Sequence, residues 1–276
     1  MSYYRKEKWL MFDSFNRKIN YLRVSVTDRC NLRCVYCMPE CGVTPVAHDQ
    51  ILSFEEIVEV IQYAVSHGVD KVRITGGEPL VRRGIVELVA KIAGIQGIRD
   101  LGMTTNAILL DRFAQPLVDA GLHRVNISLD TIDPVRFRQI TRTGQIEDVF
   151  RGIDAARKAG LEPIKINCVI KETSDEPDAA GVKDFCRANG LELRFIHEMN
   201  LETGQFSVVE GGDGGHCSSC NRLRLTANGD LKPCLFSDLA FNIRELGIKK
   251  AYLAAIGNKP GCGSVNMKSR FSNIGG

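Results

Sequence analysis

The alternation of strand-like and helix-like segments limits the fold of this chain more than any other feature. Between residues 22 and 196, short apolar runs alternate with amphipathic segments whose apolar residues recur at helical spacing. Ser53 and Glu56 form a capping box at the start of the first such helix, and Gly68 ends it. Because strand–helix–strand units with short connections form right-handed parallel crossovers, the pattern predicts an α/β fold with six strands in an open or partial barrel.

The predicted strands place several polar segments at one end of the sheet. The strands are expected at residues 22–26, 71–75, 99–104, 124–129, 163–170 and 191–196. The remaining helices are expected at residues 84–92, 111–120, 134–140, 146–159 and 178–189. Sites in such folds lie at the carboxyl ends of the strands. A cysteine-rich loop and the segments 76–79, 104–106 and 128–130 all fall there.

The pattern changes after Met199. The glycine-rich stretch 209–215 has the composition of a loop or flexible linker, and cysteines recur beyond it. We therefore expect a barrel domain over residues 1–200 and a small cysteine-bearing lobe over residues 201–276.

The composition is that of an ordinary globular protein. With 276 residues, of which 44% are hydrophobic and 25% charged, the chain is long enough to bury a full core. No apolar run approaches the ~18 residues of a membrane span, and the first residues lack a signal-peptide core. A formal net charge of +3 is too small to indicate a nucleic-acid-binding protein. We expect a soluble cytoplasmic protein with no membrane or nucleic-acid partner.

A first set of cysteines lies on one tight loop, at Cys30, Cys34 and Cys37. Thiolates select iron–sulfur clusters or zinc, and a closed structural site normally has four ligands. Three ligands favour a cluster with one open iron. Cys41 is an alternative fourth ligand of a closed site, although Pro39 stiffens the chain before it.

A second set of three cysteines follows the linker, at Cys217, Cys220 and Cys234. It fits either a second three-ligand iron–sulfur cluster, which we favour, or a zinc site closed by Cys262. The isolated cysteines are expected to be small buried hydrophobic residues, and they are Cys168, Cys186 and Cys262.

Three motifs of the barrel resemble the radical S-adenosylmethionine (SAM) enzymes. They are the CxxxCxxC spacing, the run from Tyr21 to Arg29, and Gly76-Gly77-Glu78-Pro79. The resemblance implies a partial TIM-type (β/α)6 barrel with a small C-terminal iron–sulfur lobe. It also implies a 4Fe-4S cluster whose open iron binds SAM, so that one electron cleaves SAM to a radical that removes hydrogen from a substrate.

The C-terminal motifs are similar to one family of these enzymes, the MoaA family of GTP 3′,8-cyclases. The motifs are the runs from Cys217 to Thr226 and from Lys232 to Ser237, and the final Ile274-Gly275-Gly276. The resemblance implies a lyase with two 4Fe-4S clusters that converts GTP to (8S)-3′,8-cyclo-7,8-dihydroguanosine 5′-triphosphate in molybdenum cofactor biosynthesis. The implied partners are a reductant such as flavodoxin or ferredoxin and a downstream cyclic pyranopterin phosphate synthase. The resemblance is also compatible with a homodimer.

The same resemblance implies the residues of each site. SAM is expected to contact Tyr36, Gly76, Gly77, Glu78, Thr104, Ser128 and Met199. GTP is expected to contact Arg23, Lys71, Arg73, Lys165, Arg194, Arg222 and Arg224. The tail, Gly275 and Gly276, is expected to reach into the active site. Independently of the family, Lys71 and Arg73 share one face of a strand, where paired cations need an anionic partner.

The chain departs from the family pattern before the second cysteine set. Only seventeen residues separate Met199 from Cys217, where the family has a longer segment with its own helix and strands. Two alternatives accompany the cyclase interpretation. One is a radical SAM maturase acting on a peptide or protein, and the other is a non-enzymatic electron-transfer or zinc-stabilised binding module.

Overall fold

The computed structural model describes residues 12–269 and 271–274 of the chain. The strands of this part form one sheet in the order β6-β5-β4-β3-β2-β1-β7-β8-β9. Their bounds are β1 Tyr21–Ser25, β2 Lys71–Thr75, β3 Asp100–Thr105, β4 Arg124–Ser128, β5 Lys165–Ile170, β6 Glu192–His197, β7 Arg222–Leu225, β8 Asp230–Lys232 and β9 Phe241–Asn242.

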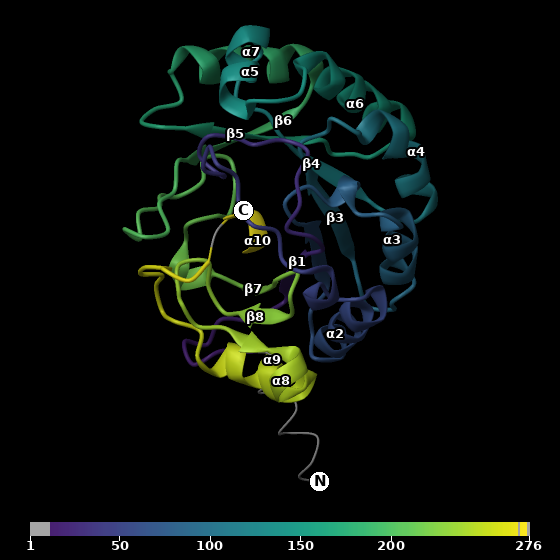
Figure 1. Ribbon diagram of the computed structural model, residues 1–276, viewed down its shortest axis with the longest axis vertical. Coiled ribbons are helices and arrows are strands. Elements are labelled where there is room, and N and C mark those ends of the chain that lie inside the picture. Colours follow the sequence, from purple (N-terminus) through teal and green to yellow (C-terminus); the bar gives the residue numbers. More distant parts are fainter. Residues whose placement is uncertain (1–11, 270, 275–276) are drawn as a thin grey trace.

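Strands β1 to β6 are parallel and lie in chain order, which confirms the predicted partial barrel. The sheet curves around the centre of the molecule, and helices cover its outer side (Figure 1). The helices are α2 Phe54–Ser66, α3 Ile85–Ala93, α4 Leu110–Asp119, α5 Pro134–Thr141, α6 Ile146–Ala159, α7 Pro177–Asn189, α8 Ile243–Leu246, α9 Ile248–Gly257 and α10 Phe271–Ile274. Strands β6 and β9 end the sheet, so hydrogen bonds between the described strands do not close the barrel.

Alternation along the strands separates the core from the barrel interior. In β1, Leu22 and Val24 are fully buried among the hydrophobic core residues, and in β2, Val72 and Ile74 occupy the same core. Side chains at the intervening positions point to the opposite face of the sheet. Basic residues at those positions are therefore held inside the barrel, away from the helices.

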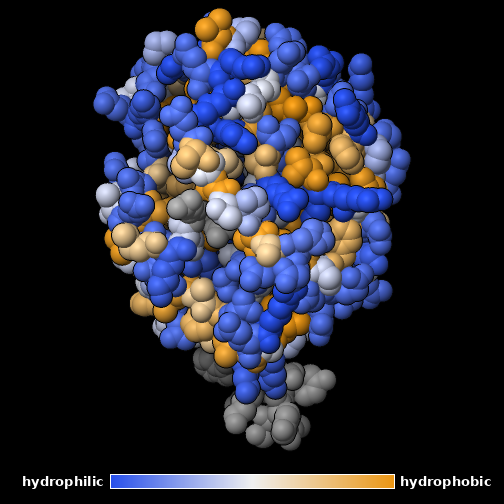
Figure 2. All heavy atoms as spheres, viewed as in Figure 1, coloured by the Kyte–Doolittle hydropathy of each residue, from blue (hydrophilic) through white to orange (hydrophobic). Residues whose placement is uncertain are grey.

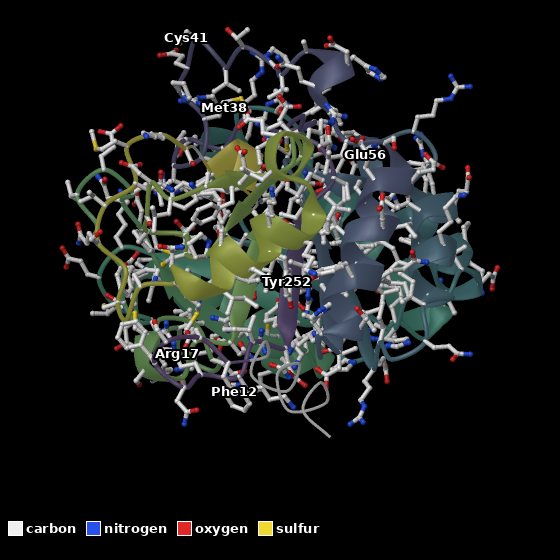
Figure 3. The ribbon with its side chains drawn as sticks, turned by 90° about the horizontal axis from the view of Figure 1, so that it is seen from below. Phe12, Arg17, Met38, Cys41, Glu56 and Tyr252 are labelled. Carbon is white, nitrogen blue, oxygen red and sulfur yellow. The ribbon has the colours of Figure 1, made fainter. Side chains whose placement is uncertain are left out.

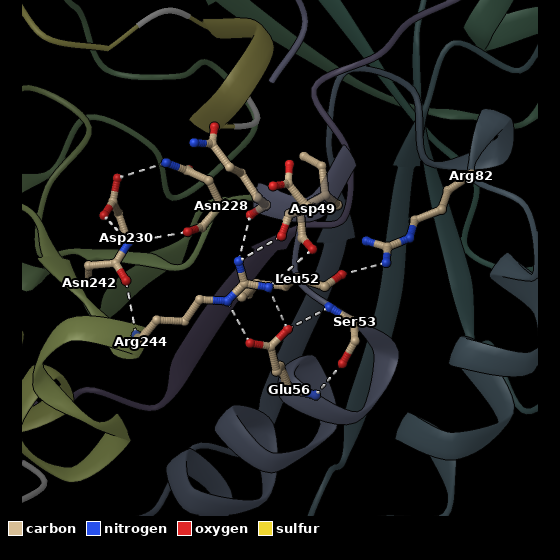
Figure 4. A network of polar contacts seen from close by, with 11 residues as sticks. Asp49, Leu52, Ser53, Glu56, Arg82, Asn228, Asp230, Asn242 and Arg244 are labelled. Carbon is tan, nitrogen blue, oxygen red and sulfur yellow. Dashed lines mark hydrogen bonds and ion pairs between the residues drawn. The ribbon is translucent and has the colours of Figure 1, made fainter. Parts of the chain in front are cut away.

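The predicted capping box is confirmed at the start of α2. The Ser53 hydroxyl accepts a hydrogen bond from the Glu56 amide at 3.1 Å, and the Ser53 amide donates to the Glu56 carboxylate at 2.7 Å. Arg244 of α8 pairs with the same carboxylate and donates to the carbonyls of residues 49–51 (Figure 4). This network joins the C-terminal segment to the first barrel helix.

The C-terminal segment extends the barrel sheet. Strand β7 pairs in parallel with β1, and β8 and β9 follow in antiparallel order. Tyr252 of α9 is fully buried in the same hydrophobic core as the barrel residues (Figure 3). The division of the chain at residue 200 stays a prediction.

Hydrophilic side chains cover most of the face seen in Figure 2, with a group of apolar side chains right of its centre. No helix in the described ranges is long and apolar enough to cross a membrane.

Candidate active site

Two adjoining cavities lie in the barrel, the first at the carboxyl ends of the strands and the second toward their amino ends. The first cavity, of about 230 Å³, contains the first cysteine set and the predicted SAM residues. The second cavity, of about 200 Å³, contains the second cysteine set and most of the predicted GTP residues. The residues that line both cavities are Arg23, Asn167, Ile196 and Met199. A ligand in one cavity therefore lies next to a ligand in the other.

The first cysteine loop is held by backbone hydrogen bonds. The amides of Cys37 and Met38 both donate to the Cys34 carbonyl, at 3.0 and 2.9 Å. Arg142 donates to the carbonyls of Arg33 and Met38 and so fixes the loop to the end of α5. Cys30, Cys34 and Cys37 all line the first cavity.

Cys41 lies apart from the first cysteine set. It is exposed, does not line the first cavity, and points outward at the edge of the molecule (Figure 3). The predicted three-cysteine arrangement is therefore the one that faces the cavity. Burial raises the pKa of Cys30 to about 11 and that of Cys34 to about 12, so these thiols ionise readily only beside a cation.

Gly76 and Gly77 let two backbone segments approach closely. The Gly77 amide donates to the Thr27 carbonyl at 2.7 Å, and the Glu78 amide donates to the Arg29 carbonyl at 2.8 Å. A Cβ atom on Gly77 would lie 2.3 Å from the Arg29 carbonyl oxygen. The glycine therefore sets the position of the chain that leads into the first cysteine loop.

Gly77→Ala should displace the first cysteine loop, because the added methyl group meets backbone and not a flexible side chain. We expect loss of most iron from the first cysteine set and of SAM cleavage, measured by iron content and 5′-deoxyadenosine release. Gly94→Ala is the matched control, since its Cβ would lie 3.6 Å from the nearest atoms. Normal iron content in Gly77→Ala would contradict this role.

Glu78 is a buried carboxylate at the floor of the first cavity. It is 1% exposed and accepts hydrogen bonds from the Thr105 hydroxyl and the Asn106 amide, each at 2.7 Å. Burial raises its pKa to about 7 despite these bonds. Such a carboxylate gains most from a ligand that brings a positive charge.

Tyr36 connects the cysteine loop to the far side of the first cavity. Its hydroxyl donates to Asp130 at 2.8 Å, and Asp130 also accepts from the Val169 amide at 2.8 Å. Burial raises the pKa of Asp130 to about 6. Thr104 and Ser128 line the same cavity, and their contact with SAM stays a prediction.

Basic residues of three neighbouring strands lie in register in the second cavity. Arg23 of β1 is opposite Arg73 of β2 and Arg224 of β7, and Tyr21 of β1 is opposite Lys71 and Arg222. Residues that are opposite each other on neighbouring strands point to the same face of the sheet, so this register brings the basic side chains together inside the barrel. Arg194 of β6 faces the same space.

The second cavity is positive, because its buried arginines keep pKa values above 7 although burial lowers them. Burial lowers the pKa of Arg73 to about 10 and that of Arg224 to about 9. Burial alone would raise the pKa of Tyr21, but the surrounding cations, Arg23 and Arg73 foremost, lower it to about 8. The Nε atoms of Arg73 and Arg194 are buried without a hydrogen-bond partner among the described residues. The cavity is thus suited to a ligand with several negative charges.

Lys165 differs from the other predicted GTP residues. It does not line the second cavity, and its ammonium group pairs with Glu192 of β6. Its predicted role in binding GTP stays a prediction.

The second cysteine set lines the second cavity, where Lys259 holds two of its segments together. Lys259 is 2% exposed and donates to the carbonyls of Arg222 at 2.8 Å and Pro233 at 2.6 Å. Burial would raise the pKa of Cys220, but the charge of Lys259 lowers it overall. No three His, Cys, Asp or Glu side chains of the described residues are spaced for a single metal ion.

The isolated cysteines have different environments. Cys168 and Cys186 are buried, as predicted. Cys262 is exposed and its sulfur lies 3.3 Å from that of Cys217, so its assignment as a buried hydrophobic residue is wrong. Cys262 lies in a turn after α9 and not on a helix that packs in the core. The spacing of the cysteines alone does not reveal this position.

The shortened segment before Cys217 forms a wall of the second cavity. Glu210 bridges to Phe195 of β6, and the Phe206 ring stacks on Phe236 with centroids 4.5 Å apart. Phe206 and the glycines 212, 214 and 215 line the cavity. The segment therefore covers the open side of the barrel next to β6.

The described part of the tail packs beside both cavities. Ile274 is 1% exposed in a small hydrophobic cluster with Leu201, Leu235 and Phe236, and Phe271 lines the first cavity. The predicted tail residues Gly275 and Gly276 lie outside the described residues.

Sequence reasoning missed several residues that shape the cavities. They are Arg17, Tyr21, Asn106, Asp130, Asn167 and Lys259. The polar strand-end segments at 104–106 and 128–130 were a signal for Asn106 and Asp130. Lys259 and Arg17 gave no local signal, because their partners are distant in the chain.

Comparisons with known proteins agree with this arrangement. The radical SAM superfamily model matches residues 24–185, and the model described as Molybdenum Cofactor Synthesis C matches residues 183–256. The chain is 42% identical to the GTP 3′,8-cyclase of Thermodesulfovibrio yellowstonii, over 86% of this chain and 88% of the relative. The GTP 3′,8-cyclase of Heliobacterium modesticaldum is 43% identical, over 85% and 86% of the two chains.

Solved structures show the same fold at low identity. Streptococcus suis SuiB bound to S-adenosylmethionine has a TM-score of 0.64 and 17% identity, covering 93% of this chain and 68% of that one. Methylornithine synthase (PylB) has a TM-score of 0.55 and 15% identity, covering 71% and 58%. The fold, the family models and the relatives above 40% identity agree, and the chain belongs to the GTP 3′,8-cyclase family of the radical SAM superfamily.

Proposed function

We propose that this chain catalyses the GTP 3′,8-cyclase reaction, the first step of molybdenum cofactor biosynthesis. Relatives that cover most of the chain carry this name. The observation that supports it best is the pair of adjoining cavities, one with the motif for SAM and one rich in buried cations. The cations fit the triphosphate of GTP, while the shared residues place the nucleotide beside SAM.

The first cavity would hold the cofactors that the superfamily implies. Cys30, Cys34 and Cys37 would bind a 4Fe-4S cluster, and Glu78 would face the amino group of SAM. When bound, these groups supply an electron and a 5′-deoxyadenosyl radical that removes hydrogen from C3′ of GTP. The protein's own part is to hold SAM and GTP in contact and to exclude water.

The second cavity would hold a second 4Fe-4S cluster on Cys217, Cys220 and Cys234. Its open iron would bind the guanine ring, next to Arg222 and Arg224. The donor set fits, because all three thiols line one cavity and Lys259 favours the thiolate of Cys220. Phe206 and the glycine-rich segment would cover the substrate.

SAM affinity should rise with pH up to about 7, because the ammonium group of SAM favours ionised Glu78. Free Glu78 has a pKa of about 7. Below that value binding must displace a proton, so affinity should change by up to about tenfold per pH unit. Isothermal titration of cluster-loaded protein between about pH 5.5 and 7 measures this.

Glu78→Gln is the control for the pH dependence, since it cannot ionise. It should bind SAM with a weaker and pH-independent affinity. A wild-type affinity that does not change over this range would show that Glu78 does not meet a positive charge.

GTP affinity should fall when Arg222 or Arg224 is replaced by Ala. Each loses charge-assisted hydrogen bonds worth roughly 1.5 to 3 kcal/mol, or about 10-fold to 150-fold in Kd. Equilibrium binding of labelled GTP measures the change, and Arg151→Ala, at an exposed site on α6, is the control. Uncoupled SAM cleavage should stay near wild type. Unchanged GTP binding in the double variant would favour a peptide substrate instead.

Two alternatives have less support. The fold likeness to SuiB is compatible with a maturase, but buried cations suit a nucleotide better than a peptide. An electron-transfer or zinc-binding module would have no use for a cavity lined by Gly76, Gly77 and Glu78. We also propose that the protein works in the cytoplasm with a flavodoxin-like or ferredoxin-like reductant and passes its product to a cyclic pyranopterin phosphate synthase.

A further inference from the structure

Two cysteines from distant segments meet at the edge of the second cavity. The sulfur of Cys262, in the turn after α9, lies 3.3 Å from the sulfur of Cys217, which begins the short 3-10 turn Cys217–Ser219. Cys262 is exposed, and it does not line the second cavity with the other three cysteines. It therefore approaches Cys217 from the solvent side.

A buried arginine holds the two cysteine segments against each other. Arg17, which is 6% exposed, donates to the carbonyls of Cys217 and Pro260, each at 2.7 Å, and to that of Gly261 at 3.1 Å. Asp13 fixes the guanidinium group by an ion pair at 2.6 Å. Arg17 thus fastens the backbone beside both thiols, so their contact is set by a buried network and not by two loose loops.

The sulfur contact fits a disulfide better than a shared metal ion. Two thiolates on one tetrahedral zinc, with bonds of about 2.3 Å, lie about 3.8 Å apart. The sulfurs of Cys217 and Cys262 are already closer than that. A disulfide bond has a length of about 2.05 Å, so the two sulfurs must close a gap of about 1.2 Å to form one.

We propose that Cys217 and Cys262 form a reversible disulfide when the second cluster is lost, which removes Cys217 from the cluster ligands until it is reduced. This rests on the proposed function only in treating Cys217 as a ligand. In the loaded protein an iron occupies the Cys217 thiolate, so the bond does not form. The pair would thus protect the vacant site from irreversible oxidation of Cys217.

The oxidant would be a small disulfide such as oxidised glutathione. The Cys262 thiolate attacks one sulfur of the small disulfide, which forms a mixed disulfide and releases one small thiolate. The Cys217 thiolate then attacks the Cys262 sulfur and releases the second small thiolate. Two protein thiols lose two electrons and two protons in total, and one small disulfide becomes two small thiols.

The experiment compares the full-length protein with its clusters and after removal of iron by a chelator. Both forms are incubated with oxidised glutathione, alkylated and digested, and the linked peptides are identified by mass spectrometry. Cys262→Ser is the test variant, and Cys41→Ser is the matched control, because Cys41 is also exposed.

We expect a Cys217–Cys262 link in the chelated wild type and in Cys41→Ser, and none in Cys262→Ser or in the loaded protein. The oxidised wild type should take up about four irons in place of about eight, until dithiothreitol restores the rest. A link between Cys217 and Cys220, or free Cys262 after oxidation, would overturn the proposal. If fully reduced protein takes up only about four irons, the proposal of a second cluster is wrong. The linked peptides still show whether the disulfide between Cys217 and Cys262 forms.

Discussion

Cys30→Ala should abolish 5′-deoxyadenosine release from SAM, which is the largest effect we expect from any single substitution. The three cysteines of the first set face one cavity, and two thiolates cannot hold a cube of four irons with one iron open to SAM. The reconstituted Cys30→Ala variant should therefore contain about four irons per chain, whereas the wild type should contain about eight. Anaerobic incubation with SAM and dithionite, followed by chromatography, measures the release.

Cys41→Ala is the control for this substitution, because Cys41 is exposed and outside the first cavity. It should keep its iron and its SAM cleavage. If Cys41→Ala loses a whole cluster, the first site has four protein ligands and its iron is not open to SAM.

Cys217→Ala should stop conversion of GTP while SAM cleavage without GTP continues. The second cysteine set lines a different cavity from the first, so its loss leaves the SAM site unchanged. Iron content should again fall to about four per chain. Cys220→Ala is a second variant with the same expected result. This variant removes one cysteine of the second set but keeps Cys217, which is the residue that contacts Cys262.

An equal loss of SAM cleavage and GTP conversion in both variants would contradict separate roles for the two cysteine sets. In that case the second set would maintain the fold of the barrel. Thermal unfolding of each variant distinguishes this outcome, because a structural role lowers the unfolding temperature.

Local patterns were sufficient to predict the barrel. Strand β2 and helix α6 begin and end at the predicted residues, and the capping box at Ser53 is confirmed, since periodicity and capping depend on residues close in sequence. The three thiols of each cysteine set line one cavity, and their role as cluster ligands stays a prediction. These features need no information about distant partners.

Contacts between distant segments could not be predicted in this way. The alternating residues 222–225 indicate a strand, but nothing in them specifies pairing with β1, which aligns Arg224 with Arg23. The clamp of Arg17 on Cys217 and Pro260 and the contact of Cys262 with Cys217 also depend on the folded chain. The pairing of Lys165 with Glu192 shows the same limit, since strand register decided its partner.

The shortened segment after Met199 makes the substrate the central question. It forms part of the wall of the second cavity through Phe206, and Glu210 bridges to Phe195 of β6. A nucleotide substrate follows from the charge of that site and from the family. The chemistry must be shown on GTP itself.

The most direct test is anaerobic incubation of reconstituted protein with SAM, dithionite and GTP carrying deuterium at C3′. The account predicts one deuterium in the 5′-deoxyadenosine and a cyclised nucleotide of unchanged elemental composition except for that deuterium, both detected by mass spectrometry. Unlabelled 5′-deoxyadenosine with GTP fully recovered would contradict the proposed function.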